Sequence, residues 1–211
     1  MKNKRYYSHY SRGRKKYFDD PYVRKAHEIG VRSRSWFKLD EIQKHEKLLK
    51  PKMRVMDLGS SPGGWAQYAI KKVGSKGNVI GCDLLSIDPI SGVEFIQGDV
   101  RDHNVRKTLL KTISNKNVNV VMSDMSPNLS GFSTADHPRS MDLAEIALQL
   151  CRDTLVVTGS FLVKVFHGEG LDLYLQKISE QFHKLKIIKP ESSRKNSREI
   201  YIIATGYKKY R

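Results

Sequence analysis

The sequence predicts an α/β fold built on a mostly parallel sheet with helices on both faces. Short apolar runs typical of strands alternate with amphipathic stretches typical of helices along most of the 211 residues. This alternation indicates βαβ units, whose parallel strands are covered by helices. A glycine-rich loop, DLGSSPGGW at 57–65, follows the first strand and opens a helix. Ligands of such sheets bind at the carboxyl ends of the strands.

The first helix is expected at 35–49, where Trp36, Leu39 and Ile42 form one apolar stripe and Pro51 follows the end. Further helices are expected at 63–74, 103–114, 136–157 and 171–185. Strands are expected at 54–60, 77–84, 93–100, 118–125, 159–166, 184–190 and 199–207. The last two strands are separated only by a loop, so we expect antiparallel neighbours in a seven-stranded, Rossmann-like sheet.

The fifth strand, GSFLVKVF at 159–166, contains one lysine in an apolar run. A continuous apolar strand is typical of burial on both faces of a sheet. Strand parity places Leu162 and Lys164 on one face and Val163 and Val165 on the other. Burying an ammonium group is costly unless a partner compensates it. Lys164 therefore needs an explanation that packing does not supply.

The formal net charge of +16 is concentrated at both ends of the chain. Residues 1–38 hold twelve Lys or Arg against three acids, and residues 184–211 hold nine against two. The first segment also interleaves aromatics with its cations: Tyr6, Tyr7, Tyr10 and Tyr17. Cations suit phosphates and aromatic rings can stack on bases, so we predict RNA contact. A solubilising tail and a mitochondrial presequence are the alternatives.

The chain is expected to form one domain at 31–211, preceded by a basic, partly flexible RNA-contacting arm at 1–30. It contains no apolar run of about 18 residues, which predicts no membrane span. No secretory signal is visible, and Cys82 and Cys151 form neither a metal-spaced pair nor a disulfide framework. These features favour a cytoplasmic, monomeric protein without a structural metal.

The glycine loop and the acids after it predict a nucleoside-containing cofactor without phosphate. The loop is not G-x-G-x-x-G, which argues against a pyrophosphate cradle. Asp83 ends the second strand and can accept hydrogen bonds from both hydroxyls of a ribose. Asp99 ends the third strand and can accept a hydrogen bond from the amino group of adenine. Asp124 ends the fourth strand. A positive sulfonium suits these carboxylates, so S-adenosylmethionine is the predicted cofactor; ordinary turns with acidic caps are the alternative.

Five motifs in this order resemble one family. They are SRSWFKL (33–39), DLGSSPGGW, DMSPN, FLVKVF and SREIY. Together they are similar to the FtsJ (RrmJ) ribosomal RNA 2′-O-methyltransferases, from about residue 20 to the C-terminus. The resemblance implies a class I methyltransferase fold that uses S-adenosylmethionine. It also implies that the substrate is a uridine ribose in the large-subunit (23S) ribosomal RNA, methylated on the assembled 50S subunit.

The resemblance implies a catalytic tetrad, which the motif matches place on Lys38, Asp124, Lys164 and Glu199. In the cofactor site it implies Gly63, Trp65, Asp83 and Asp99, with Asp124 near the methyl donor. A ribose hydroxyl must lose its proton as it attacks, so a base is required. We expect Lys164 to be that base, Asp124 to orient it, and the other two residues to position the ribose. Taken singly, Lys38 and Glu199 fit solvated surface positions, and Trp65 fits a helix core.

Other functions fit the residues less well. A base N-methyltransferase would need an aromatic residue after its motif, which DMSPNL does not offer, and a cytosine C5 enzyme would need a placed nucleophilic cysteine. An oxidoreductase would need the pyrophosphate fingerprint. A methyltransferase for transfer RNA or the messenger RNA cap and a non-catalytic ribosome-assembly factor stay open as alternatives.

Overall fold

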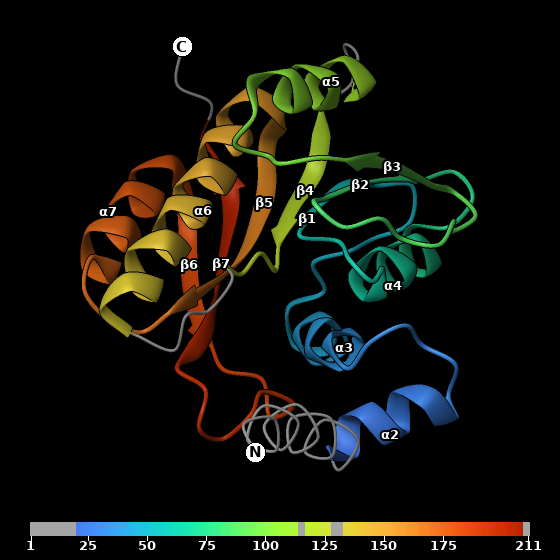
Figure 1. The fold of residues 1–211 in the computed structure, drawn as a ribbon. Helices are drawn as coiled ribbons and strands as arrows, with labels where there is room; N and C mark the ends of the chain where they lie inside the picture. The colour runs from blue at the N-terminus through green and yellow to red at the C-terminus, as the bar shows by residue number, and fades with distance from the viewer. Residues whose placement is uncertain (1–19, 114–116, 128–132, 209–211) are drawn as a thin grey trace, which may run out of the picture.

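The computed structural model describes residues 20–113, 117–127 and 133–208 (Figure 1). Seven strands form one sheet in the order β3-β2-β1-β4-β5-β7-β6. The strands are β1 (Arg54–Leu58), β2 (Asn78–Asp83), β3 (Val93–Gln97), β4 (Val118–Ser123), β5 (Leu155–Phe166), β6 (Phe182–Ile188) and β7 (Glu199–Tyr207). The helices are α2 (Pro21–Glu28), α3 (Ser35–Glu46), α4 (Gly64–Val73), α5 (His103–Ile113), α6 (Ser133–Thr154) and α7 (Leu171–Gln181).

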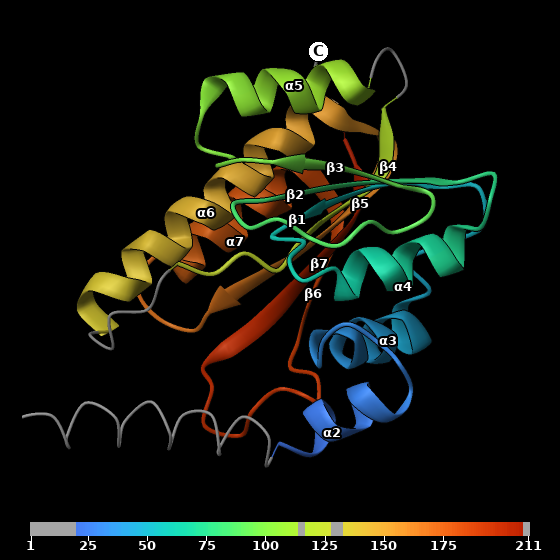
Figure 2. The ribbon, with the colours of Figure 1, turned by 45° about the vertical axis from the view of Figure 1, so that its right-hand side comes forward.

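The predicted fold class is confirmed. Strands β1 to β5 pair in parallel, whereas β7 is antiparallel to both β5 and β6. Helices α6 and α7 cover one face of the sheet and α3 and α4 cover the other (Figures 1 and 2). Because β7 runs against its neighbours, it begins at the edge where β1, β4 and β5 end. Residues from both ends of the chain can therefore meet at that edge.

Strand β5 is buried on both faces, as its composition predicts. Phe161, Val163 and Val165 belong to the core shared with α5, α6 and α7, whereas Leu162 belongs to the core shared with α3 and α4. This alternation confirms the parity expected from the sequence. Lys164 lies on the face of Leu162 and is 8% exposed.

The boundary between α6 and β5 differs from the prediction. The helix expected through residue 157 ends at Thr154, and β5 starts at Leu155 instead of 159. The register between β4 and β5 shifts here, because Val118 pairs with Leu155 whereas Val120 pairs with Ser160. Extra residues in one strand form a bulge, which apolar periodicity alone does not predict.

The helix predicted at 171–185 is too long. Helix α7 ends at Gln181, and Phe182 begins β6 with extended backbone. Phe182 lies inside the helix expected at 171–185, but its ring stacks on Phe161 and it pairs with Tyr207 across β6 and β7. Tertiary packing of the aromatic ring thus overrides the helical pattern. The first predicted helix is also shorter, since α3 ends at Glu46 and Lys47 is left-handed.

Helix α2 was not predicted. Asp20 caps it by accepting a hydrogen bond from the backbone N–H of Tyr22 at 3.0 Å, and Pro21 opens its first turn. Val23 and Ala26 are buried. An acid followed by proline is a recognised helix start, so the signal was present in the sequence. The proposed boundary at residue 30 stays a prediction, and the tyrosines of the arm lie outside the described residues.

Within the described ranges, no helix is long and apolar enough to cross a membrane.

Replacing Phe161 with Ala should destabilise the protein by about 3–5 kcal/mol, because removing a fully buried ring from the inner strand β5 leaves a cavity. Chemical denaturation measures this loss. The control is Leu173→Ala on α7, where the side chain is 67% exposed and the expected change is within about 0.5 kcal/mol. Equal effects at the two positions would contradict the assigned core.

Candidate active site

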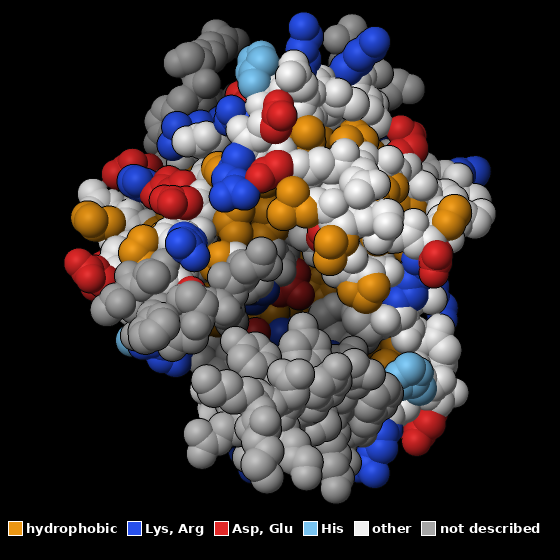
Figure 3. Space-filling view, in the orientation of Figure 1, with side chains coloured by type: hydrophobic (Ala, Val, Ile, Leu, Met, Phe, Trp, Pro, Cys, Tyr) orange, Lys and Arg blue, Asp and Glu red, His pale blue; other side chains and the backbone are white. Residues whose placement is uncertain are grey.

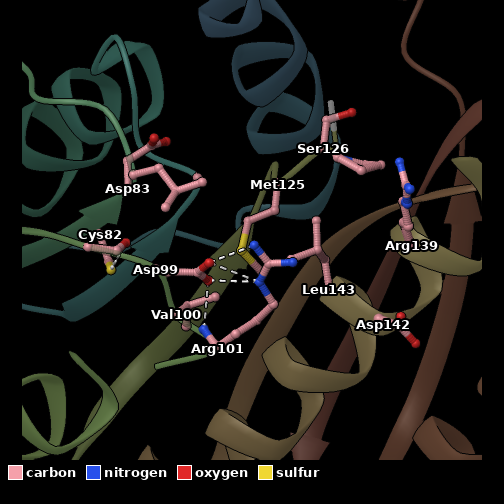
Figure 4. Close-up of a pocket in the computed structure, with 14 residues that line it drawn as sticks. Cys82, Asp83, Asp99, Val100, Arg101, Met125, Ser126, Arg139, Asp142 and Leu143 are labelled. Carbon is pink, nitrogen blue, oxygen red and sulfur yellow. Dashed lines mark hydrogen bonds and ion pairs between the residues drawn. The ribbon is translucent and has the colours of Figure 1, made fainter. Parts of the chain in front are cut away.

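A cavity of about 440 Å³ opens where β1, β2, β3 and β4 end. Its volume suits a small organic ligand. Figure 4 shows the side chains around it, which come from the strand ends and from α6. The lining residues are Gly59, Cys82, Asp83, Leu84, Gly98, Asp99, Val100, Arg101, Met125, Ser126, Pro127, Arg139, Asp142 and Leu143. Two of the predicted cofactor residues, Asp83 and Asp99, therefore line one cavity.

Gly59 lets the loop after β1 approach the loop after β4. Its φ is +76°, and a Cβ there would lie 2.8 Å from the backbone N of Met125. Only glycine fits both the backbone conformation and the contact. The close approach brings the cavity floor next to Asp124, because Met125 lines the cavity and directly follows that aspartate.

The carboxylate of Asp83 is held in place by backbone donors. Its Oδ2 accepts from the N–H of Ser61 and its Oδ1 accepts from the N–H of Leu85, each at 2.9 Å. A carboxylate oxygen has two lone pairs, so each oxygen keeps acceptor capacity. Asp83 can therefore orient the glycine loop and still accept two ligand hydroxyls.

Gly63 and Trp65 are not among the lining residues of this cavity. Gly63 has a φ of +105° and starts α4, where an added Cβ would meet Ile90 and Arg32. Trp65 is 2% exposed, and its Nε1 donates to the Ser35 carbonyl at 2.8 Å. Their contact with a cofactor stays a prediction.

The four residues of the predicted tetrad come together as two ion pairs. Lys164 Nζ lies 3.1 Å from Asp124 Oδ1 and donates to the Asp124 carbonyl at 2.8 Å. Lys38 Nζ, from α3, lies 2.7 Å from Glu199 Oε1. All four side chains are at most 15% exposed. Figure 3 shows a hollow in this face of the molecule with acidic and basic side chains inside it.

Strand register explains how three of these residues meet. Ser123 pairs with Val163, so Asp124 comes next to Lys164 where β4 ends. On the other side of β5, Lys164 pairs with Tyr201 and Phe166 with Glu199. Residues two apart on a strand share a face, so Tyr201 and Glu199 point the same way.

Tyr201 links the two ion pairs, a role that the sequence analysis missed. Its hydroxyl donates to Asp124 Oδ1 at 2.9 Å and accepts from Lys38 Nζ at 3.1 Å. Burial and the carboxylates of Asp124 and Glu199 raise the pKa of Tyr201 well above its ordinary value. It therefore stays a neutral donor. Its position in SREIY, on the same strand face as Glu199, was the available signal.

Asp57 is a second residue that the sequence analysis missed. Its carboxyl group is fully buried at the end of β1, and its Oδ2 accepts from Ser60 Oγ at 2.8 Å. Within the described residues, its Oδ1 has no hydrogen-bond partner. Desolvation raises the pKa of Asp57 to about 7, against the hydrogen bond from Ser60, and the charges of Asp124 and Asp83 add to the rise.

The family model for FtsJ-like methyltransferases matches residues 31–207. The chain belongs to the FtsJ-like methyltransferase family. A crystal structure from Plasmodium falciparum, provisionally assigned as a ribosomal RNA methyltransferase, superposes with a TM-score of 0.75 at 26% identity and covers 84% of this chain and 98% of its own.

A provisionally assigned rRNA methylase from Clostridium thermocellum has a TM-score of 0.55 at 17% identity, covering 80% of this chain and 95% of its own. At that identity the likeness supports the fold alone.

FtsJ-like methyltransferases use S-adenosylmethionine as the methyl donor. The cavity fits this cofactor, because Gly59 allows a ligand close approach to the backbone. The three carboxylates of the lining, Asp83, Asp99 and Asp142, also outnumber its two cations, Arg101 and Arg139, which suits a cationic ligand. Among the described residues, no group of three His, Cys, Asp or Glu side chains is placed to hold a metal ion.

The free energy of unfolding of Asp57→Asn, relative to that of the wild type, should increase as the pH rises. The folded state keeps the Asp57 proton up to about pH 7, whereas the unfolded chain releases it near its ordinary pKa of 3.8. The contribution of Asp57 to wild-type stability is therefore fully present below pH 4 and is lost as the pH rises toward 7. The loss is about 1.4 kcal/mol for each intervening pH unit.

Urea denaturation at pH 4.5 and pH 7.5 measures this change. Met56→Ala, on the same strand, is the control, because its cost should be the same at both pH values. An Asp57→Asn stability difference that does not change with pH would contradict the raised pKa.

Proposed function

We propose that this FtsJ-like methyltransferase transfers a methyl group from S-adenosylmethionine to the 2′-hydroxyl of a uridine ribose in large-subunit ribosomal RNA, with the assembled 50S subunit as substrate. One observation carries the proposal: a buried lysine, Lys164, is held by Asp124 beside the cofactor cavity. The likeness to the Plasmodium protein, which is provisionally assigned as a ribosomal RNA methyltransferase, supports ribosomal RNA as the substrate class.

The chemistry requires positioning and one proton acceptor. S-adenosylmethionine supplies an activated methyl group, so the enzyme mainly aligns the ribose oxygen with it. When the ribose hydroxyl attacks, the new O–CH₃ bond would replace the S–CH₃ bond of the donor, and Lys164 Nζ would accept the hydroxyl proton. A lysine accepts a proton only as the neutral amine, which desolvation and a nearby cation favour.

The remaining residues orient this base and the ribose. Asp124 binds Lys164 through both its carboxylate and its carbonyl, which fixes the direction of the amine. Tyr201 connects Asp124 to Lys38, and Lys38 is paired with Glu199. The Lys38–Glu199 pair offers both a donor and an acceptor, which suits a ribose with two neighbouring oxygens.

The loop at 189–198 supports contact with RNA. It leads directly into Glu199 and carries four exposed cations: Lys189, Arg194, Lys195 and Arg198. Glu41 accepts from the N–H of Ser192 at 3.1 Å and Arg34 donates to the Ser192 carbonyl, so the loop is fixed to α3 and its N-terminal cap. The cations are thus held near the active site, where phosphates flanking the target nucleotide would lie.

Lys164→Ala should lower methyl transfer by at least about 10²-fold, because a positioned base contributes that much or more. Tritiated methyl transfer to undermethylated large subunits measures it, and cofactor binding should stay within about twofold. Lys177→Ala, an exposed lysine on α7, is the matched control with wild-type activity.

Full activity of Lys164→Ala would reject the base assignment. A wild-type chain that binds RNA but transfers no methyl group would instead support the assembly-factor alternative.

Reversing two loop charges with Lys195→Glu and Arg198→Glu should weaken RNA binding. Each lost phosphate contact lowers the slope of log affinity against log salt by about 1. Filter binding across a salt series measures the slope. The control is Lys107→Glu on α5, at the opposite end of the molecule (Figure 1). An equal slope change in the control would show that the loop has no special contact.

A further inference from the structure

Asp99, after β3, is held by three donors from Arg101. The backbone N–H of Arg101 donates to Oδ1 at 2.9 Å. The guanidinium Nε lies 2.9 Å from Oδ1 and 3.0 Å from Oδ2, and Nη2 donates to Oδ2 at 2.6 Å. Figure 4 shows the guanidinium closed over the carboxylate inside the cavity.

This pair is poorly placed to stabilise the fold. The side chains of Arg101 and Asp99 are 62% and 28% exposed. Exposed ion pairs contribute little to stability, because solvent screens them and both side chains lose entropy. Both residues line the cavity, however, so the pair can act on a ligand instead.

The contacts fix both the charge and the direction of the carboxylate. The hydrogen bond from Arg101 lowers the pKa of Asp99, which keeps the carboxylate ionised as an acceptor. An ionised carboxylate has about four lone-pair sites, and the three N–H groups of Arg101 reach each oxygen twice, because the Nε–H is shared between Oδ1 and Oδ2. Three N–H groups thus share four sites, so the capacity for about one ligand N–H group remains where the Nε–H is shared.

Arg101 also interacts at longer range with a carboxylate on α6. Its own pKa is raised, first by the hydrogen bond to Asp99 and in smaller part by the charge of Asp142 on α6. Asp142 lines the same cavity. Both carboxylates therefore favour the charged form of the guanidinium.

We propose that Arg101 is a positioning residue for the cofactor. By holding Asp99 with one acceptor site left, it selects a purine that presents an amino group at position 6. A 6-oxo purine presents a carbonyl oxygen there, which leaves the carboxylate without a donor and is disfavoured. This inference rests on the predicted adenine-binding role of Asp99. It does not depend on the RNA substrate.

Isothermal titration of S-adenosylhomocysteine and S-inosylhomocysteine tests the proposal without any methyl transfer. Arg101→Ala should weaken binding of the adenosyl compound about tenfold, as expected for a hydrogen bond to a charged group. Binding of the inosyl compound should change less than twofold. Arg101→Lys should restore only part of the loss, because lysine lacks the planar fork.

Two further variants separate positioning from general effects. In an Asp99→Ala background, Arg101→Ala should change affinity less than twofold, since the residue acts through Asp99. Arg139→Ala removes another cation from the cavity lining while leaving the Asp99 contacts, so it should affect both compounds equally. Thermal melting of each variant reports whether the fold is retained.

Tighter binding of the adenosyl compound by Arg101→Ala would overturn the proposal and show that the guanidinium competes with adenine. Equal losses for both compounds would also overturn it, because Arg101 would then act without regard to the amino group. An Asp99→Ala variant with wild-type affinity would remove its basis. Each outcome is read from binding alone, so it is distinguishable from failure of ribosomal RNA methylation.

Discussion

The candidate active site depends on the burial of the Lys164 side chain beside the Asp124 carboxylate, with Nζ 3.1 Å from Oδ1. Burying charges costs free energy that their attraction offsets only when further hydrogen bonds satisfy them. Here Lys164 also donates a hydrogen bond to the Asp124 carbonyl, and the Tyr201 hydroxyl donates one to the Asp124 carboxylate. The surrounding fold supplies those partners at fixed positions. A polar group of this kind inside an apolar strand is therefore evidence of function more than of stability.

The antiparallel strand β7 makes this arrangement possible. It starts at the sheet edge where β4 and β5 end, so Glu199 and Tyr201 enter the site from a strand running the opposite way. Helix α3 then places Lys38 against both residues. The network thus joins residues from across the chain, and each charged side chain is compensated by a partner from another element. Removing one charged member leaves the buried charge of its partner uncompensated.

The predicted cofactor cavity and the predicted tetrad meet at one short stretch of backbone, Asp124 and Met125. Gly59 brings the loop after β1 within contact of Met125, which lines the cavity, while Asp124 faces Lys164. In the proposed function, adjacent residues therefore position the methyl donor and the proton acceptor. Asp57, buried beneath the same loop, places a high-pKa carboxyl group below this junction. The site combines rigid strand ends with few exposed groups, which favours precise alignment of donor and acceptor.

The sequence by itself determined the alternation of strands and helices, the two-sided burial of β5 and the odd character of Lys164, because these follow from local periodicity and composition. It also placed Asp83 and Asp99 at strand ends that share an edge. The helix ends at Thr154 and Gln181 were decided only by tertiary structure, since a bulge and aromatic packing override local pattern. The bridging by Tyr201 and the hold of Arg101 on Asp99 likewise depend on register and side-chain direction, which a linear sequence does not specify.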